Sequence, residues 1–558
     1  MKKIKKICLT VLCVVLIVSA FSGCSSAPKA IDFIYPFDGK ISSFDPQIAS
    51  TSDEFLIIEN CFEGLVRVTD DGTVQPGVAE SWEISSDKLT YTFRLRQDAK
   101  WNIDTELDED GQRKKDSRLE LVGYDFNPNI TANDFVFALR RAVDKNTASP
   151  LYSSVANIVN APEINSGSIS ADELGIRAVD NYTLEIKLKS PDEGFLNTLS
   201  TAVAMPCNEK FFNATKGRYG LGTEYTLFNG QFYVDIVLDT SYVLDKNDLY
   251  FGEHPSAVSD ITLKIKNEDS DIVKNLKNGY YDCAYISGKE YEQLNDSNIT
   301  AVPYSNKTWA FILNKNKLLF SNEKLRQAVC LGISDIDTEE HKYLSPATNF
   351  TPPSCIVNGK SATESMGSTV PRQDSFRAVE LWKKGLEETG YSSADLTVIV
   401  TEDMEEIAKE FVQGIQGSIG KVTAYGTGDE NKINFSLKIE VLNQDSFNSA
   451  FSKGEYDLAL YCFEATSQSA DTYLDKIVNG NYAGEIEEAQ EAVETVQNAS
   501  AAEKVSAYRE CETVLMNDYS VMPVLFESSY YAQAKGVSGV QFHPGSGRVS
   551  FVNATRED

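Results

Sequence analysis

Serine, lysine and histidine are the residues of this chain that could most readily support hydrolysis. Two stretches, Ser85–Lys88 and Ser321–Lys324, have the S-x-x-K spacing of penicillin-binding enzymes. Neither is accompanied by a K-T-G or S-D-N element, and the sequence has no G-x-S-x-G motif. The three histidines, His254, His341 and His543, lie far apart and form no H-E-x-x-H motif. The sequence therefore predicts no enzymatic activity, no metal site and no cofactor.

Cys24 follows a short apolar segment near the start of the chain. Four lysines precede an apolar run at 7–20, which is shorter than the roughly 20 residues that a membrane-spanning helix needs. A basic region followed by a short apolar run is typical of an export signal. Ser22-Gly23-Cys24 resembles a bacterial lipobox, in which the cysteine is acylated, although Phe21 replaces the usual aliphatic residue. We therefore predict a signal peptide at 1–23, a lipid on Cys24 and a tether at 24–29, with an ordinary secreted protein as the alternative.

The chain is strongly acidic. Its 558 residues include 52 Lys and Arg against 82 Asp and Glu, a net charge of −30. Loss of residues 1–23, which hold four lysines and no acid, makes this −34. Such a charge disfavours nucleic acid and anionic lipid as partners. Beyond Cys24, seven scattered cysteines form no C-x-x-C pair, and their odd number argues against a complete disulfide framework. We expect most of them to be small buried side chains.

Hydrophobic periodicity predicts the surrounding secondary structure. Apolar and polar residues alternate, as in half-buried strands, over three segments: "YTFRLR" (91–96), "YTLEIKL" (182–188) and "INFSLKIEV" (433–441). Thr131 and Asp134 have the spacing of a capping box, which predicts a helix over the following residues. Residues 376–463 alternate helical and strand patterns, which favours an α/β lobe with a largely parallel sheet.

One long stretch resembles a known family. Residues 59–101, "ENCFEGLVRVTDDGTVQPGVAESWEISSDKLTYTFRLRQDAKW", are similar to the signature region of extracellular solute-binding proteins of the oligopeptide-binding type (family 5). Similar matches follow in order: "FDPQIAS" (44–50), "TANDFVFALRRAVD" (131–144), "FILNKNKLLFSNEKLRQAV" (311–329) and "YRECETVLMNDYSVMPVLF" (508–526). An insertion around 103–129 departs from the family pattern.

The resemblance implies an α/β fold of the periplasmic-binding-protein type II, with two lobes around a cleft and an extra sublobe. The implied boundaries are 30–59, 191–305 and 526–558 for lobe 1, 60–190 for its sublobe and 306–525 for lobe 2. Two chain crossings then form a hinge near Pro303–Leu313 and Tyr519–Ser528, so that ligand contacts differ between open and closed states.

The implied function is that of a membrane-anchored extracytoplasmic receptor of an ABC importer. It would capture oligopeptides and deliver them to a permease and its ATPase subunits, as a monomer held to the membrane by its lipid alone. The same fold also binds nickel complexes, haem or oligosaccharides, so a non-peptide solute is the alternative. A surface hydrolase or an adhesive lipoprotein is the alternative from another class.

Five residues are candidates for ligand binding. Trp309, in "NKTWAFILN", is expected beside the crossing strand, where it either lines the cleft or belongs to the core. Family members hold the ligand's α-ammonium with an aspartate just after a strand. In the matching stretch, Phe463-Glu464-Ala465-Thr466-Ser467, Thr466 occupies that position.

This substitution leaves two possibilities. Either Glu464 or Asp471 supplies the carboxylate, or both are solvated charges and no free amine is held. The sequence slightly favours the second, hence a longer or modified peptide or a non-peptide solute.

The lipobox prediction can be tested by replacing its cysteine. Cys24→Ala removes the thiol that would carry the acyl chains, so we expect the variant to leave the membrane fraction or to remain unprocessed. Fractionation and intact-mass measurement would detect both effects. Normal maturation and membrane retention of the variant would refute the lipid anchor.

Overall fold

The computed structural model describes residues 31–557, apart from thirteen short gaps. The gaps are residues 70–72, 106–115, 193, 253–257, 268–270, 295–297, 392, 421–433, 466–468, 481, 483–485, 501 and 544–547. Cys24, the predicted signal and the predicted tether lie outside the described residues. Among the described helices, none is long and apolar enough to cross a membrane.

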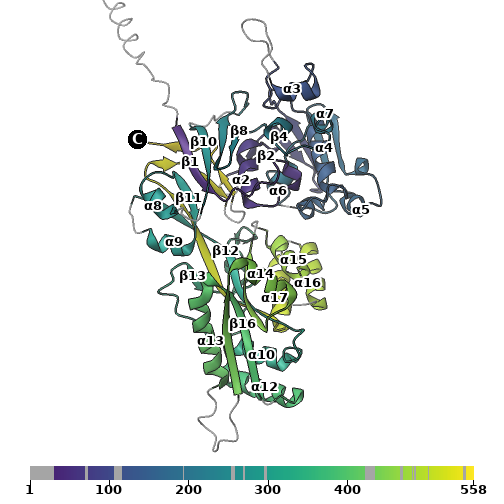
Figure 1. Ribbon diagram of the computed structural model, residues 1–558. Coiled ribbons are helices and arrows are strands. Elements are labelled where there is room, and N and C mark those ends of the chain that lie inside the picture. The colour runs from purple at the N-terminus through teal and green to yellow at the C-terminus, as the bar shows by residue number, and fades with distance from the viewer. Residues whose placement is uncertain are drawn as a thin grey trace, which may run out of the picture.

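The molecule is elongated, with an upper and a lower part joined by long strands (Figure 1). The upper part contains a mixed sheet in the order β1-β10-β9-β8, in which β1 and β10 are parallel and the other pairs antiparallel. Its strands are β1 (Ile31–Phe37), β8 (Phe232–Leu238), β9 (Ser241–Lys246) and β10 (Val258–Ile265). The N-terminal strand thus pairs with a segment more than 200 residues later in the chain.

A second sheet of the upper part is antiparallel, in the order β4-β5-β7-β6. Its strands are β4 (Ala79–Ile84), β5 (Thr90–Leu95), β6 (Ile176–Asp180) and β7 (Thr183–Lys187). Tyr91, Phe93 and Leu95 are buried while Arg94 is exposed, which confirms the predicted alternation. Helix α4 (Ala132–Val143) packs beside β6. It begins where predicted, because Asp134 accepts a 2.7 Å hydrogen bond from the Thr131 N–H.

The largest sheet runs into the lower part, in the order β11-β19-β12-β18-β16-β17, with β13 paired to β19. Its strands are β11 (Cys283–Ile286), β12 (Thr300–Leu313), β13 (Leu344–Pro346), β16 (Ser393–Thr401), β17 (Asn434–Leu442), β18 (Leu458–Glu464) and β19 (Val521–Gln533). The pairs β16–β17 and β16–β18 are parallel, as predicted for this region. The pairs of β12 with β18 and β19 are antiparallel, so the sheet is mixed.

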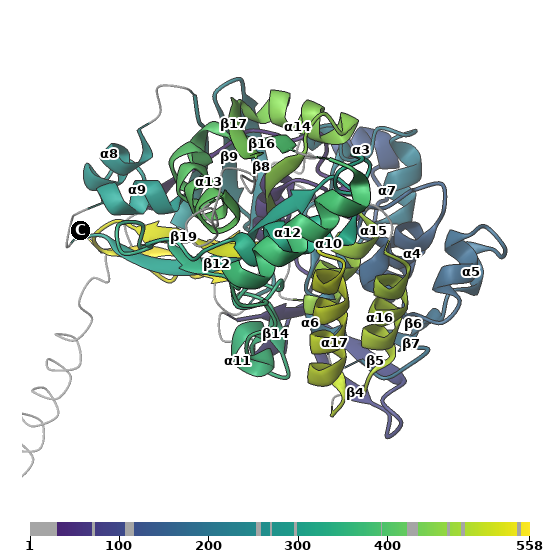
Figure 2. The same cartoon turned by 90° about the horizontal axis from the view of Figure 1, so that it is seen from below.

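Helices cover both faces of this sheet, and its strands alternate between two cores. Trp309, Phe311 and Leu313 enter one core, whereas Ala310 and Ile312 enter the other. The first core is covered by α8 (Ile272–Lys277), α9 (Gly288–Gln293), α10 (Glu323–Gly332), α12 (Ser375–Thr389) and α13 (Glu405–Gly420). The second is covered by α11 (Ala362–Met366), α14 (Gln444–Lys453), α15 (Ala470–Asn479), α16 (Glu487–Asn498) and α17 (Lys504–Asn517). Figure 2 shows α16 and α17 side by side.

The remaining helices and strands are short. The helices are α2 (Ser52–Cys61), α3 (Ser117–Val122), α5 (Ala161–Asn165), α6 (Phe195–Thr198) and α7 (Glu209–Ala214). The paired strands are β2 (Val66–Val68) with β3 (Val74–Pro76), β14 (Ile356–Val357) with β15 (Lys360–Ser361), β20 (Val537–Ser538) with β23 (Thr555–Arg556), and β21 (Gln541–His543) with β22 (Arg548–Ser550). The 3-10 turns are η1 (Pro46–Ile48), η2 (Tyr152–Val155), η3 (Ala171–Glu173), η4 (Ala202–Ala204), η5 (Thr223–Tyr225) and η6 (Glu402–Met404).

The upper part has its own core, which contains residues of both of its sheets. Residues of α8, β11 and α9, which the predicted boundaries assign to lobe 1, contribute to the first core of the large sheet. The exact division into lobes stays a prediction. Each of the seven cysteines after Cys24 is a free thiol, and all but the half-buried Cys462 are buried, as expected.

A buried ion pair ties the N-terminal segment to the second sheet's helix. The Arg141 guanidinium on α4 donates to both carboxylate oxygens of Asp45 and also to the side-chain oxygen of Gln47 at 2.8 Å. The side chains of Arg141 and Asp45 are only 10% and 4% exposed. Removing one partner of such a pair leaves the other charge buried without a counter-ion.

We predict that Arg141→Met lowers the free energy of unfolding by about 3–5 kcal/mol, because Asp45 is left buried without its cation. Urea unfolding followed by circular dichroism measures this. Arg177→Met is the matched control: Arg177 pairs with Glu185 at 2.9 Å on the surface, and its loss should cost far less. Equal destabilisation by the two variants would contradict the prediction.

Candidate binding site

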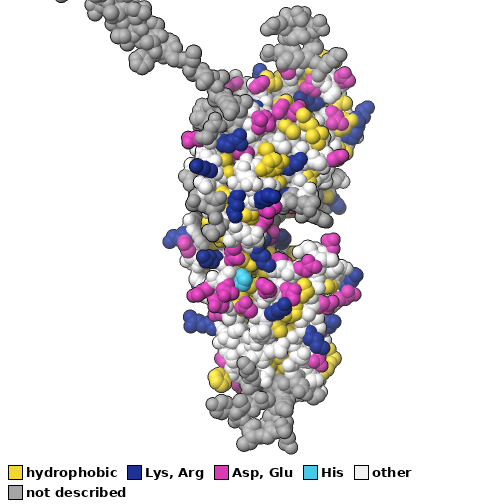
Figure 3. Space-filling view, turned by 60° about the vertical axis from the view of Figure 1, so that its left-hand side comes forward, with side chains coloured by type: hydrophobic (Ala, Val, Ile, Leu, Met, Phe, Trp, Pro, Cys, Tyr) yellow, Lys and Arg dark blue, Asp and Glu magenta, His cyan; other side chains and the backbone are white. Residues whose placement is uncertain are grey.

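Two strands carry the chain between the upper and lower parts. β12 and β19 pair antiparallel along almost their whole length, from Thr300 opposite Gln533 to Ile312 opposite Val521. Their upper ends pair with or lie beside β11, and their lower ends adjoin β18 and β13. Figure 3 shows the surface hollowed between the two parts, and in Figure 1 β12 runs from one part to the other at this level.

The pairing of the two strands is interrupted at the crossing. The register shifts between Tyr304 and Lys307, which leaves Ser305 and Asn306 outside the ladder. Their carbonyls instead accept hydrogen bonds from the backbone N–H groups of Ser354 at 3.0 Å and Ala465 at 2.9 Å. A bulge of this kind bends a strand and increases its local twist. A second shift lies between Trp309 and Ala310, but it leaves out the single residue Val524, so the interruption at Ser305 and Asn306 is the larger of the two.

A row of alternating charges lies across three strands directly beside the bulge. Lys307 on β12 is directly opposite Glu464 on β18 and Glu527 on β19. Directly opposite residues of antiparallel strands share a face of the sheet. The Lys307 ammonium lies 3.1 Å from Oε1 of Glu527, and these side chains are 22% and 10% exposed. Glu464 is exposed, and its Oε1 accepts a 3.0 Å hydrogen bond from the Asn306 amide.

This row keeps its lysine charged. Burial by itself would lower the pKa of Lys307, but the carboxylate of Glu527 and further groups including Glu464 raise it well above its usual value. The phenol of the nearby Tyr285 is also perturbed, because burial raises its pKa to about 12. In this row one lysine ammonium thus lies between two carboxyl groups.

Trp309 contacts the row from within the core. Its side chain is 5% exposed, and its indole N–H donates a 2.6 Å hydrogen bond to Oε2 of Glu527. The sequence allows two positions for this ring, lining the cleft or packing in the core. Its burial is that of a core residue. Its polar edge nevertheless belongs to the charged row. Contact with a ligand stays a prediction.

The structure does not bring all the candidate residues together. Phe463 lies on the opposite face of the sheet from Glu464, packed against Phe350 and Tyr461 in the second core. Asp471 on α15 accepts a 2.7 Å hydrogen bond from the Tyr508 hydroxyl and lies 3.0 Å from the Lys504 ammonium. Thr466 lies outside the described residues. Glu464 is thus the candidate carboxylate whose side chain lies in the charged row.

The sequence analysis missed Lys307, Glu527 and Asn306. Lys307 directly precedes the apolar run "TWAFIL" of β12, and Glu527 directly follows the apolar run "VMPVLF" of β19. Each is the single charged residue of its strand, and this was the signal that could have found them. The S-x-x-K matches have structural roles. Ser85 caps the turn between β4 and β5 through Asp87, and Lys324 pairs with Glu388 on the surface.

Comparison with known proteins identifies the family. Residues 73–485 match the model of the bacterial extracellular solute-binding proteins, family 5. The chain belongs to this family. It is 24% identical to the dipeptide-binding protein DppE of Bacillus subtilis over 90% of this chain and 88% of that protein. It is 27% identical to the periplasmic oligopeptide-binding protein OppA of Haemophilus influenzae over 86% of this chain and 85% of that protein.

Solved structures confirm the type II binding-protein fold. The substrate-binding domain of an oligopeptide ABC transporter from Bacillus anthracis superimposes with a TM-score of 0.73 at 22% identity, covering 95% of this chain and 99% of that one. Listeria monocytogenes OppA bound to peptide gives a TM-score of 0.71 at 23% identity, covering 95% of this chain and all of that one. The predicted α/β fold class and family are therefore correct.

The position of Trp309 predicts a fluorescence response of this family member. If a ligand bends the chain at the predicted hinge, the distances of Glu527 and Lys307 from the indole change, so we expect the emission of Trp309 to shift on binding. Trp309→Phe should remove the shift. Trp382→Phe, which changes a fully buried tryptophan on α12, should leave it unchanged. The outcome that contradicts this role is an equal emission shift in Trp309→Phe and in the unmodified protein, with a ligand whose binding calorimetry has detected.

Proposed function

We propose that this protein is the extracytoplasmic receptor of an ABC importer that captures oligopeptides between its upper and lower parts. The observation that carries the proposal is the bulged crossing of β12 and β19, with the charged row of Lys307, Glu464 and Glu527 beside it. Bending at this crossing would bring the two parts together over a ligand, as in hinge closure of binding proteins. Relatives named as dipeptide- and oligopeptide-binding proteins support the choice of ligand.

In this proposal the protein acts as a monomer and catalyses no reaction. Its lipid on Cys24 holds it at the membrane, where it delivers peptide to the permease and the associated ATPase subunits. An extended peptide would be held mainly through its main chain, a mode in which hydrogen bonds to the backbone tolerate varied side chains. The net negative charge of the chain suits neither nucleic acid nor an anionic membrane as the ligand.

The charged row bears on how the peptide's N-terminus is held. Glu464 already has Asn306 as a hydrogen-bond donor and Lys307 as a cross-strand neighbour, and Asp471 is engaged by Tyr508 and Lys504. Both acids therefore have cationic or donor partners within the chain. This supports a ligand whose amino end is not anchored by either carboxylate, in line with the leaning from the sequence.

Native mass spectrometry followed by calorimetry tests the proposal. We expect the purified protein to bind members of a series of alanine peptides of about two to six residues, with their masses unchanged after incubation. N-acetylation of the tightest binder should change its affinity less than about threefold, because no carboxylate pairs with the amine. Asp471→Asn and Glu464→Gln should then bind both forms alike.

Other outcomes separate the alternatives. Binding of a nickel complex, haem or an oligosaccharide, with no binding of peptides, would show that the ligand is a non-peptide solute. Cleavage of the peptides would indicate a hydrolase. A strong preference for the free amine that Glu464→Gln removes would show that Glu464 holds the ligand's ammonium group.

A further inference from the structure

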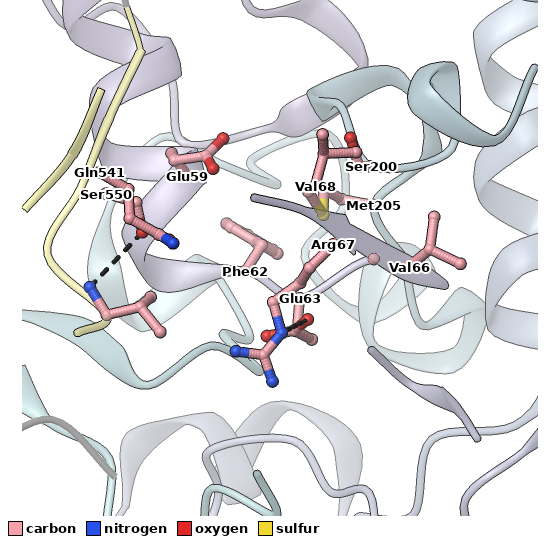
Figure 4. Close-up of a pocket in the computed structure, with 12 residues that line it drawn as sticks. Glu59, Phe62, Glu63, Val66, Arg67, Val68, Ser200, Met205, Gln541 and Ser550 are labelled. Carbon is pink, nitrogen blue, oxygen red and sulfur yellow. Dashed lines mark hydrogen bonds and ion pairs between the residues drawn. The ribbon is translucent and has the colours of Figure 1, made fainter. Parts of the chain in front are cut away.

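A second polar feature lies in the upper part, away from the charged row. The end of α2, strand β2, the segment around η4 and the hairpin β21–β22 enclose a small pocket of about 30 Å³ that is partly open to solvent (Figure 4). Phe62, Met205 and Val552 supply apolar walls, and Arg67, Ser200 and Gln541 supply polar groups. In Figure 1, α2, β2 and α6 lie at the border of the upper part that faces the lower part. Pockets that combine apolar walls with a few convergent polar groups are typical ligand sites.

Arg67 is held at this pocket by a buried acid. Its Nε lies 2.9 Å from Oε1 of Glu63, whose side chain is only 4% exposed. Glu63 is itself oriented by a 2.9 Å hydrogen bond from the Tyr250 hydroxyl to its other oxygen. Burial raises the pKa of Glu63, and the carboxylate of Glu63 raises the pKa of Arg67, so the guanidinium stays charged.

The backbone around Glu63 makes room for its carboxylate. A Cβ added to Gly77 would come within 2.8 Å of Oε1 of Glu63 and 2.7 Å of the Gly64 carbonyl oxygen. Only glycine therefore fits at position 77 without moving the carboxylate. Glu63 acts as a positioning residue that fixes one edge of the Arg67 guanidinium.

The other edge of the guanidinium remains available. Among the described residues, Glu63 is the one acid or polar group that pairs with Arg67, and the Arg67 side chain is 30% exposed. Figure 4 shows its two terminal nitrogens directed away from Glu63. Glu59 also lines the pocket and has an interaction of its own. Two parallel N–H donors on a guanidinium match the two oxygens of a carboxylate.

We propose that this pocket binds a carboxylate of the captured peptide, with the terminal nitrogens of Arg67 as bidentate donors. The inference rests on the proposed function, because it assumes a peptide ligand. The carboxylate belongs either to the peptide's C-terminus or to an acidic side chain. Phe62, Met205 and Val552 would contact the aliphatic atoms next to it. A lysine at position 67 would keep the charge beside Glu63 but lose the planar fork.

Calorimetry on the full chain with paired peptides tests this subsite. The probes are the tightest-binding alanine peptide with a free or an amidated C-terminus, and amidated versions with one internal Ala replaced by Glu or Gln. We expect the unmodified protein to prefer a carboxylate-bearing peptide by about tenfold. Arg67→Lys, chosen because it leaves Glu63 paired, should reduce this preference to below about threefold. The free-acid pair and the Glu/Gln pair together show which carboxylate is bound.

Arg177→Lys is the matched control, since Arg177 also pairs through its Nε with a glutamate but lies on the surface of β6. It should keep the full preference. A preference that survives Arg67→Lys, or its absence in the unmodified protein, overturns the subsite while leaving peptide binding intact. Failure of the unmodified protein to bind any of the peptides overturns the proposed function and the subsite together.

Discussion

The antiparallel pairing of β12 with β19 is the constraint on which the rest of the structure depends. Each strand extends from the upper part into the lower part and is buried on both faces for much of its length. Because the strands are separated by more than 200 residues, this pairing brings the C-terminal region back to the upper part. Two strands tied by a ladder of hydrogen bonds resist sliding but can bend, and the bulge at Ser305 and Asn306 shows where their ladder is weakest.

The position of the charged row follows from that pairing. Lys307, Glu464 and Glu527 come from three strands that are distant in sequence, and they share a face because register places them directly opposite one another. A lysine this poorly exposed is stable as a cation only beside acids, and Glu527 provides one at 3.1 Å. The charged cluster therefore sits at the hinge that we propose, where closure would change its contact with solvent.

The two polar features of the molecule differ in construction. In the charged row one cation lies between two acids, and its ammonium donates a 3.1 Å hydrogen bond to Glu527. In the pocket of the upper part, Glu63 forms an ion pair with Nε of Arg67, and no described residue pairs with the terminal nitrogens. The first arrangement joins neighbouring strands at their crossing, whereas in our proposal the second presents a donor pair to a ligand.

The family, the α/β fold class and many of the helices and strands could be predicted from patterns in the sequence. The capping box at Thr131 began a helix, the alternation at Tyr91–Leu95 formed a strand, and the repeated helix and strand patterns after residue 375 formed parallel pairs. These are local signals, since a cap or a period of two depends on neighbouring residues. The family motif at 59–101 predicted the type II binding-protein fold, which the solved structures confirm, whereas the lobe boundaries stay a prediction.

Which side chains meet could not be predicted, because it depends on how distant segments pack together. Phe463 and Glu464 are adjacent in sequence, but a strand directs them to opposite faces, so one joins an aromatic core and the other the charged row. Asp471, a candidate from its spacing, is engaged by Tyr508 and Lys504, which approach from α17. Strand register and long-range packing set these contacts. These contacts cannot be predicted from neighbouring residues, because each depends on a partner that is distant along the chain.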